Sequence, residues 1–338
     1  MTSSSYPHKF SVAPMMDWTT SHCRQFHRLM TKNALLYTEM VTTGAIIHGD
    51  TGRFLDFDGA EHPIALQLGG HDAADLATCA KLAEKWGYDE VNLNAGCPSD
   101  RVQNGMIGAI LMAHSQLVSD ALKSMMDSVE IPITIKHRIG IDDFDSYEFL
   151  RDFVGTVAES GCKTFIVHAR KAILQGLSPK ENREIPPLDY DRVVQLKQDF
   201  QDLNIVINGG IKLHSEALGL LEAGLDGVML GREAYQNPLL LTDVDRLYYG
   251  TNNPIETSEA LNDTLVKWVG ESTSDSTPLK FIARHMLGLY SGQPGSKKYR
   301  RLLSENMTKP GADVSLFREA LSMIQLPEHL VGPSTAHC

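Results

Sequence analysis

The chain has 338 residues, enough for one large α/β barrel or two smaller domains. Its formal net charge of -11 argues against general binding of nucleic acid, unless basic residues cluster locally. The odd cysteine count and the absence of a Cys-x-x-Cys pair argue against a disulfide framework or a zinc site. No apolar run has the length of a signal-peptide core or a bilayer span, so we expect a cytoplasmic protein with no membrane segment and no metal.

Eight short apolar runs, each closed by glycine, proline, asparagine or a polar cluster, predict β-strands. They are Phe10–Met16, Leu35–Val41, Ile64–Gly70, Glu90–Cys97, Ile133–Gly140, Thr164–Arg170, Ile205–Ile211 and Gly227–Arg232. Segments with helical spacing alternate with them at Ala73–Trp86, Leu117–Ser128, Tyr147–Ser160, Tyr190–Phe200 and His214–Ala223. This alternation predicts an α/β fold, a (β/α)8 TIM barrel. A doubly wound sheet would need a glycine-rich turn after the first strand, where Pro14, Met15 and Met16 stand instead.

The carboxyl ends of the predicted strands are polar, and in a barrel these ends form the rim that carries chemistry. The polar residues are Glu39, Gln67, Asn92, Asn94, Cys97, Lys136, Arg138, His168, Arg170, Asn208 and Arg232. Side chains alternate along a strand, so Lys136 and Arg138 share a face. Cations and amides that converge on one rim predict an anionic ligand that carries a ring. Polar residues that only begin solvent-exposed loops would explain one such pair, but not polar ends on five strands.

Two glycine motifs follow the seventh and eighth predicted strands, Asn208-Gly209-Gly210 and Gly231-Arg232. Backbone N–H groups at this place in a barrel commonly bind phosphate. We therefore expect a cofactor that carries a phosphate group.

The pattern changes after Tyr235, where no strand-like run remains. Helices are expected at Glu256–Trp268, Pro278–Leu289, Lys297–Glu305 and Val314–Met323. We therefore predict a barrel domain over residues 1–240 and a helical domain over 241–330. Between Pro278 and Pro310, seven basic residues and one acidic residue give a local charge of +6, with Tyr290 and Tyr299 among them. A solvated helix face is the alternative, but the reversed sign favours a polyanionic partner.

Cys97 ends the fourth predicted strand at the turn Ala95-Gly96-Cys97-Pro98. Taken alone, such a residue is most often a buried structural cysteine. A thiol, with an ordinary pKa of about 8.5, nevertheless stays mostly protonated near neutrality and is able to donate a proton. The other polar strand ends favour this second interpretation.

These motifs together resemble the tRNA-dihydrouridine synthases over nearly the whole chain, from APMMDWTT at Ala13 to YRRLLSE at Tyr299. NLNAGCPSDRVQNGMIGAILM, from Asn92, is close to the family's signature around its catalytic cysteine. RKAILQGLSPKENREIPPLDY, from Arg170, resembles the family's A subfamily. The resemblance implies an FMN-binding barrel with a helical tRNA-binding domain. Its activity would be the reduction of uridine to dihydrouridine at positions 20 and 20a in the D-loop of tRNA, with NADPH as electron source.

The resemblance also implies roles for individual residues. FMN would be contacted by Pro14, Met15, Met16, Gln67, Lys136 and His168, and its phosphate held by Asn208, Gly209, Gly210, Gly231 and Arg232. The catalytic acid would be Cys97, and tRNA would be contacted by Asn94, Asn182, Arg183 and Arg300 or Arg301.

The chemistry supports several of these roles independently. Hydride from N5 of reduced FMN would reach C6 of the uracil, and a proton from Cys97 would reach C5. Lys136 would stabilise negative charge on the reduced flavin, and Arg138 would position Lys136 or contact the base. His168 and Arg170 would hydrogen-bond the uracil carbonyl groups.

Two alternatives stay open. A flavin barrel that acts on a free pyrimidine, like the dihydroorotate dehydrogenases, leaves the +6 segment and the helical domain unexplained. A non-catalytic RNA-binding protein on a decayed barrel conflicts with the intact set of polar strand ends. No heptad pattern or large apolar patch is evident, so a monomer is the expected state.

Overall fold

The computed structural model of the chain describes residues 7–99 and 105–325. Predictions that fall on other positions, among them the middle of the motif after Cys97, the last residues of the predicted helical domain and Cys338, lie outside the described residues.

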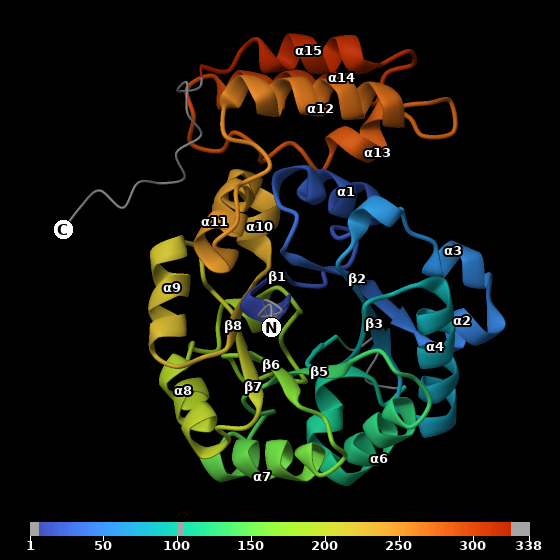
Figure 1. Cartoon of the computed structure of the whole chain (residues 1–338), viewed down its shortest axis with the longest axis vertical. Helices are drawn as coiled ribbons and strands as arrows, with labels where there is room; N and C mark the ends of the chain where they lie inside the picture. The colour runs from blue at the N-terminus through green and yellow to red at the C-terminus, as the bar shows by residue number, and fades with distance from the viewer. Residues whose placement is uncertain (1–6, 100–104, 326–338) are drawn as a thin grey trace. The chain divides into compact units, whose positions relative to one another are not determined.

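Eight parallel strands close into a barrel in which each strand pairs with the next along the chain and β8 pairs with β1 (Figure 1). They are β1 (Phe10–Val12), β2 (Leu35–Thr42), β3 (Ile64–Gly69), β4 (Glu90–Ala95), β5 (Ile133–Arg138), β6 (Thr164–His168), β7 (Asn204–Asn208) and β8 (Gly227–Leu230). Every predicted run overlaps its strand, so the predicted barrel is confirmed and the doubly wound alternative is wrong.

Helices surround the strands at the predicted places (Figure 1). They are α4 (Ala73–Trp86), α6 (Ser115–Met126), α7 (Tyr147–Ala158), α8 (Tyr190–Asp199) and α9 (His214–Glu222). Local signals set their bounds: the Asp72 side chain accepts two backbone N–H bonds at the start of α4, and Gly87 ends it with φ of 92°. Two short helices that the sequence did not predict, α2 (Thr43–His48) and α3 (Thr51–Leu55), follow β2. Neither is long enough to show a helical period.

The barrel interior has an apolar side and a polar side. The apolar side is a buried cluster of Ala13, Leu35, Tyr37, Ala65, Ile166, Val206 and Met229. Strands β4 and β5 carry polar side chains at their interior positions. The register pairs Ala65 of the apolar cluster with Glu90 on β4, and it pairs Asn92 on β4 with Thr134 on β5. Side chains at paired positions of a sheet point to the same face. Two neighbouring strands therefore line the interior with hydrogen-bonding groups.

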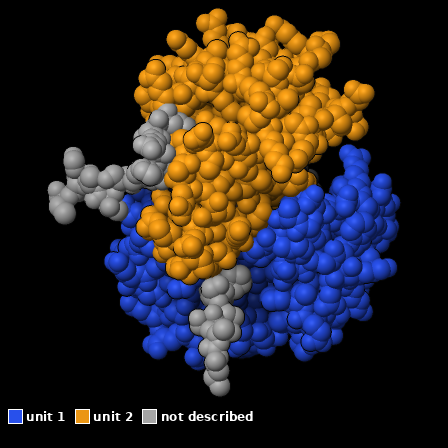
Figure 2. Space-filling view, turned by 45° about the horizontal axis from the view of Figure 1, so that its top comes forward, with its two compact units in different colours: residues 1–16, 35–230 blue, residues 17–34, 231–338 orange. Residues whose placement is uncertain are grey.

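The chain forms two compact units, drawn in blue and orange in Figure 2. The first comprises residues 1–16 and 35–230, and the second comprises 17–34 and 231–338. The division thus falls directly after β8, earlier than the predicted boundary between 240 and 241. The second unit also takes in an early segment of the chain with α1 (Ser21–Met30), which the sequence analysis had left in the barrel.

Long-range contacts hold this early segment within the second unit. The rings of Phe26 and Trp268 are 6.3 Å apart, and those of Trp18 and Tyr235 stack at 4.3 Å. The hydroxyl of Thr31 donates to the carboxylate of Asp245 at 2.5 Å. The same carboxylate also accepts hydrogen bonds from two backbone N–H groups of this early segment. Contacts over such separations leave no periodic signal in a sequence, which is why the prediction missed them.

The rest of the second unit is helical, and no strand occurs among its described residues. It contains α10 (Arg232–Gln236), η5 (Pro238–Asp243), α11 (Val244–Tyr249), α12 (Ser258–Ser272), α13 (Leu279–Ala283), α14 (Ser296–Asn306) and α15 (Val314–Leu321). The helix expected at Pro278–Leu289 is shorter than predicted. Tyr290 and Tyr299 are fully buried with their rings 5.3 Å apart, so they belong to the core of this unit rather than to a basic surface.

Among the described residues, no helix combines the length and the apolar composition that crossing a bilayer requires. Within the same ranges, no cluster of three or more His, Cys, Asp and Glu side chains is placed to hold a metal ion.

Candidate active site

Cys97 lies just beyond β4 in a turn that holds its backbone from both sides. Its N–H donates to Oδ1 of Asn94 at 2.9 Å, and the N–H of Gly96 donates to the same oxygen at 3.1 Å. Its carbonyl accepts from the N–H of Ala109 at 2.8 Å. Gly108 permits this approach, because its φ is +83° and a Cβ would lie 2.3 Å from the Cys97 carbonyl oxygen. The thiol is half-buried, whereas the other described cysteines are buried.

The amide of Asn94 is engaged inside the protein. Its Nδ2 donates to Oε1 of Gln67 at 2.8 Å, and Nε2 of Gln67 donates to Oδ1 of Asn92 at 2.9 Å. All three side chains are buried. The oxygen of Asn94 is committed to the Cys97 turn, so a ligand has access at most to its second amide hydrogen. The predicted contact with tRNA is therefore restricted to donation of one hydrogen bond.

Lys136 is half-buried on β5, in register with Asn94. Burial, helped by the nearby cations Arg138 and Arg183, lowers the pKa of Lys136 to about 7. A lysine near its titration point gains full charge when an anion binds beside it. Lys136 is thus suited to an anionic ligand, and its contact with FMN stays a prediction.

Arg138 ties two loops of the rim together. Its Nε donates to the carbonyl of Gly96 at 2.9 Å, and its Nη1 donates to the carbonyls of Lys171 and Asn182 at 3.0 Å. Burial lowers the pKa of Arg138 to about 10, so the guanidinium stays charged at neutral pH. Through these bonds the side chain braces the Cys97 turn against the loop after β6, and its predicted contact with the base stays a prediction.

Asn182 is fully buried in that loop, within η4 (Glu181–Arg183). Its Oδ1 accepts from the N–H of Ile173 at 2.7 Å, and its Nδ2 donates to the carbonyls of Ile173 at 2.8 Å and Leu177 at 3.2 Å. The predicted contact with tRNA is corrected here, because the side chain folds the loop and has no exposed surface. Its neighbour Arg183 is exposed.

At the ends of β6 and β7, the backbone of Gly209 lies directly against the ring of His168, where no side chain would fit. Its φ is +116°, and a Cβ there would lie 2.5 Å from Cδ2 of the histidine ring. The carbonyl of Gly209 accepts from the hydroxyl of Tyr190 at 2.6 Å. Burial, followed by the charges of Arg138 and other cations, holds the pKa of His168 well below its usual range. The imidazole is therefore neutral, with one ring nitrogen able to donate and the other able to accept.

The side chains of two further predicted residues also donate hydrogen bonds to backbone carbonyl groups. Nδ2 of Asn208 donates to the carbonyl of Met229 at 2.7 Å. Nη1 of Arg170 donates to the carbonyl of Pro186 and, at 3.4 Å, to that of Glu184. Both side chains thus stabilise the rim.

A family model described as dihydrouridine synthase (Dus) matches residues 11–325. The chain belongs to the dihydrouridine synthase family. A protein from Yersinia pestis named tRNA-dihydrouridine(20/20a) synthase is 58% identical over 325 residues, which are 96% of this chain and 94% of the relative. A protein of the same name from Escherichia coli strain K12 is 59% identical over 94% of this chain and 91% of its own. The family membership confirms the resemblance and sets the non-catalytic alternative aside.

Solved structures show the same barrel at low sequence identity. An old yellow enzyme homologue from Zymomonas mobilis aligns with a TM-score of 0.52 and 13% identity over 75% of this chain and 92% of its own. A 2-naphthoyl-CoA reductase aligns with a TM-score of 0.55 and 9% identity over 70% of this chain and 49% of its own. At such identities the similarity concerns the fold alone.

In this member of the dihydrouridine synthase family, the first unit brings together much of the predicted site. Gln67, Asn94, Cys97, Lys136, Arg138 and His168 lie on consecutive strands β3 to β6 or directly after them. Pro14 and Met15 are half-buried after β1, and Met16 is 58% exposed.

The remaining predicted residues belong to the second unit. Gly231 and Arg232 follow β8 directly in the chain. Arg300 and Arg301 are exposed on α14, and Nε of Arg301 donates to Glu305 at 2.9 Å.

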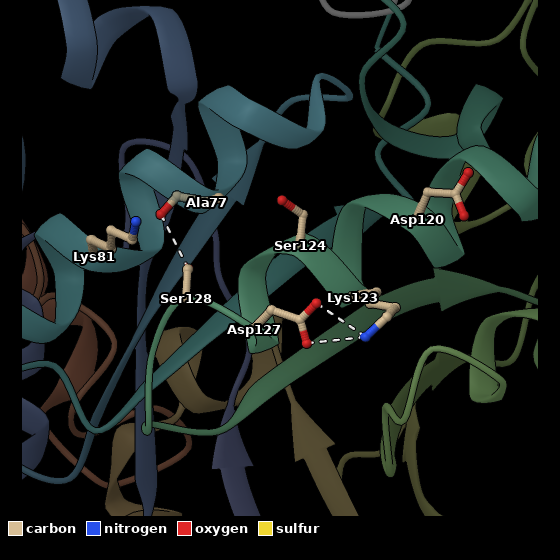
Figure 3. A pocket seen from close by; sticks show the side chains of 7 residues that line it. All are labelled: Ala77, Lys81, Asp120, Lys123, Ser124, Asp127 and Ser128. Carbon is tan, nitrogen blue, oxygen red and sulfur yellow. Dashed lines mark hydrogen bonds and ion pairs between the residues drawn. The ribbon is translucent and has the colours of Figure 1, made fainter.

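Sequence reasoning missed Gly108 and Thr134. Gly108 lies inside the signature motif around Cys97. Thr134 is two residues before Lys136 on the same strand, so their side chains share a face. Both residues could therefore have been found from the sequence. A groove between α4 and α6, lined by residues such as Lys81, Ser124 and Asp127, contains no predicted residue (Figure 3). Its charged groups pair locally, as in the 3.0 Å ion pair between Lys123 and Asp127. We assign it to helix packing.

Proposed function

We propose that this chain reduces uridine to 5,6-dihydrouridine at positions 20 and 20a in the D-loop of tRNA. The observation that carries the proposal is the near full-length identity of 58–59% to relatives that bear this activity in their names. The site agrees with it, because a half-buried thiol is held beside cationic and neutral hydrogen-bonding groups at the barrel rim.

We assign FMN as the cofactor and NADPH as its electron donor. Bound FMN, once reduced, would supply the hydride for C6 of the uracil. The residues fit such a group: Lys136 gains charge beside an anion, and Gly209 and Gly210 offer backbone N–H groups with no side chain in the way. Pro14, Met15, Met16, Gln67 and His168 would contact the rings, and Asn208, Gly231 and Arg232 would complete the phosphate site.

The chain's own residues would complete the reduction. Cys97 would donate a proton to C5 from the face of the base opposite the hydride, and the turn around it would keep the thiol in place. The neutral His168 would donate a hydrogen bond to a uracil carbonyl, where negative charge develops. Because position 20 lies within folded RNA, the base must leave its stack to reach these groups.

The basic segment of the second unit would bind the RNA backbone. Arg300 and Arg301 are exposed on α14, and Arg183 is exposed in the loop after β6 of the first unit. These local charges reconcile an RNA substrate with a net charge of -11.

The test supplies the protein with FMN and NADPH and offers it either tRNA that lacks dihydrouridine or free uridine. Mass-spectrometric mapping should find dihydrouridine at positions 20 and 20a of the tRNA and little product from the nucleoside. Turnover of free uridine alone would instead favour an enzyme of free pyrimidines, the alternative left open by the sequence.

The affinity of the flavin-free protein for reduced FMN, whose ring carries negative charge, should fall as the pH rises from 7 to 9, by at most about tenfold per unit. The ligand-free pKa of Lys136 is about 7, and a bound anion raises it, so binding takes up a proton in this range. Lys136→Met should weaken binding of reduced FMN at pH 7 and remove the pH dependence, as measured by anaerobic titration calorimetry. The exposed Lys85→Met is the matched control, and an unchanged slope in Lys136→Met would move the anion site elsewhere.

Replacing Arg300 and Arg301 together by glutamine should weaken tRNA binding and reduce the slope of log K against log salt by about one to two. Arg301 contacts Glu305 only at the surface, so the folding free energy should change by less than about 1 kcal/mol. Filter binding over a salt series measures the effect. Lys81→Gln with Lys85→Gln, two exposed charges on α4, is the control pair, and an equal effect there would show that the contacts are not local.

A further inference from the structure

A chain of buried hydrogen bonds runs through the polar side of the barrel, from the first residue of β4 to the turn beyond its last. The N–H of Cys97 donates to Asn94, whose Nδ2 donates to Gln67 at 2.8 Å. Nε2 of Gln67 donates to Asn92 at 2.9 Å, and Nδ2 of Asn92 donates to the Thr134 hydroxyl at 2.8 Å.

The chain ends on the carboxylate of Glu90. The hydroxyl of Thr134 donates to Oε1 of Glu90 at 2.6 Å, and the hydroxyl of Tyr37 donates to the same oxygen at 2.8 Å. Nε2 of His8 lies 2.7 Å from Oε2. All these side chains are buried, and Glu90 is 3% exposed. A carboxylate held by three partners is thus the anchor of the chain.

The chemistry of Glu90 determines the direction of every bond in this chain. A carboxylate only accepts, and a threonine hydroxyl has a single hydrogen to donate. Because the hydroxyl of Thr134 donates its only hydrogen to Glu90, its oxygen must accept the hydrogen bond from Nδ2 of Asn92. The same reasoning then orients Gln67, and finally Asn94.

The last member of the chain matters for the site. With the direction set, Asn94 presents its oxygen to the N–H groups of Gly96 and Cys97. Turned over, the amide would place its NH₂ group against two N–H donors, and a buried mismatch of this kind costs about 1–3 kcal/mol for each group. An inverted chain would therefore release the turn that carries the thiol.

We propose that Glu90 and Thr134 are positioning residues for Cys97, acting through the buried amides from the opposite end of the barrel strands. The inference rests on the proposed function in one respect, namely that the thiol is the proton donor. Neither residue touches the substrate, and neither stood among the predicted site residues.

Thr134→Val tests the link, because valine keeps the shape of threonine and removes the hydroxyl. Hydrogen exchange at the Gly96 and Cys97 amides, followed by mass spectrometry, should become at least tenfold faster. The kcat on tRNA should fall roughly tenfold to a hundredfold with the KM for tRNA unchanged, since a misplaced group loses rate rather than binding. Thr134→Ser should restore both measurements, and Thr134→Ala replaces the valine variant if that variant does not fold.

Ser11→Ala is the matched control. This buried hydroxyl donates to the carbonyl of Val228 at 3.4 Å and takes no part in the chain, so neither measurement should change. Unchanged exchange or unchanged kcat in Thr134→Val, or an equal loss in Ser11→Ala, would overturn the proposal. The exchange measurement needs no substrate, so failure of the wild-type protein to form dihydrouridine would contradict the proposed function separately.

Discussion

Cys97→Ala should lower the rate of dihydrouridine formation in tRNA by roughly 10²–10⁴-fold, the usual contribution of a positioned general acid. The variant should retain FMN and bind tRNA with wild-type affinity. The turn is held through backbone groups of Cys97, which alanine keeps, so the loss should come from the missing proton rather than from a displaced loop. Single-turnover kinetics with pre-reduced enzyme would measure the chemical step directly.

Two further variants sharpen this test. Cys97→Ser should recover little activity, because a hydroxyl is a far weaker acid than a thiol. Cys79→Ala removes a buried thiol on α4 and should leave the rate near wild type, although it creates a small cavity. A wild-type rate in Cys97→Ala would assign the proton donor to another group.

The free energy of unfolding should fall steeply as the pH drops from about 6.5 to 5. Burial lowers the pKa of His27 to about 3, of His137 to about 4 and of His285 to about 3. Between 6.5 and these values the unfolded chain binds protons that the folded protein does not, so stability decreases as pH falls. At pH 5 each of these histidines lowers the free energy of unfolding by about 2 kcal/mol, and the three together lower it by about 6 kcal/mol. Urea unfolding of the intact protein at pH 7.5, 6.0 and 5.0 measures this loss.

His137 allows the effect to be assigned to one ring. Its Nδ1 lies 2.7 Å from the carbonyl of Arg138, and its ring packs near Phe153 and Phe165. His137→Phe keeps an aromatic ring there, and it should reduce the loss between pH 7.5 and 5.0 by about 2 kcal/mol even if overall stability changes. His48→Gln, at an exposed histidine, should keep the wild-type slope. A wild-type slope in His137→Phe would show that the ring protonates in the folded protein.

Much of the first unit could be predicted from local patterns, because strand alternation, helical spacing and turn residues are each visible within a few positions. All eight strands and the five helices around them fall where those patterns placed them. Cys97 and Lys136 were placed at strand ends by the same reasoning, and the structure brings both to one rim. Helix lengths were less predictable, as α13 shows: it ends at Ala283, and the chain continues through turns where the helical pattern had predicted further helix.

The failures share a cause, because each concerned the partner of a polar or aromatic side chain. Asn182 was expected to contact tRNA and Tyr299 was counted within a basic segment, but both side chains are fully buried. A buried amide or phenol finds its partner through tertiary packing, and the residue type at a position does not reveal whether that position is covered.

The sequence by itself determined the barrel, its helical continuation, the family and the thiol at the end of β4, since these depend on local periodicity and on contiguous motifs. Only the tertiary structure decided that α1 belongs to the second unit and that Arg138 braces two loops. It also decided that Glu90 directs a chain of amides toward Cys97. The physical reason is that hydrogen-bond direction and burial are properties of pairs of residues brought together by folding, and no single position carries them.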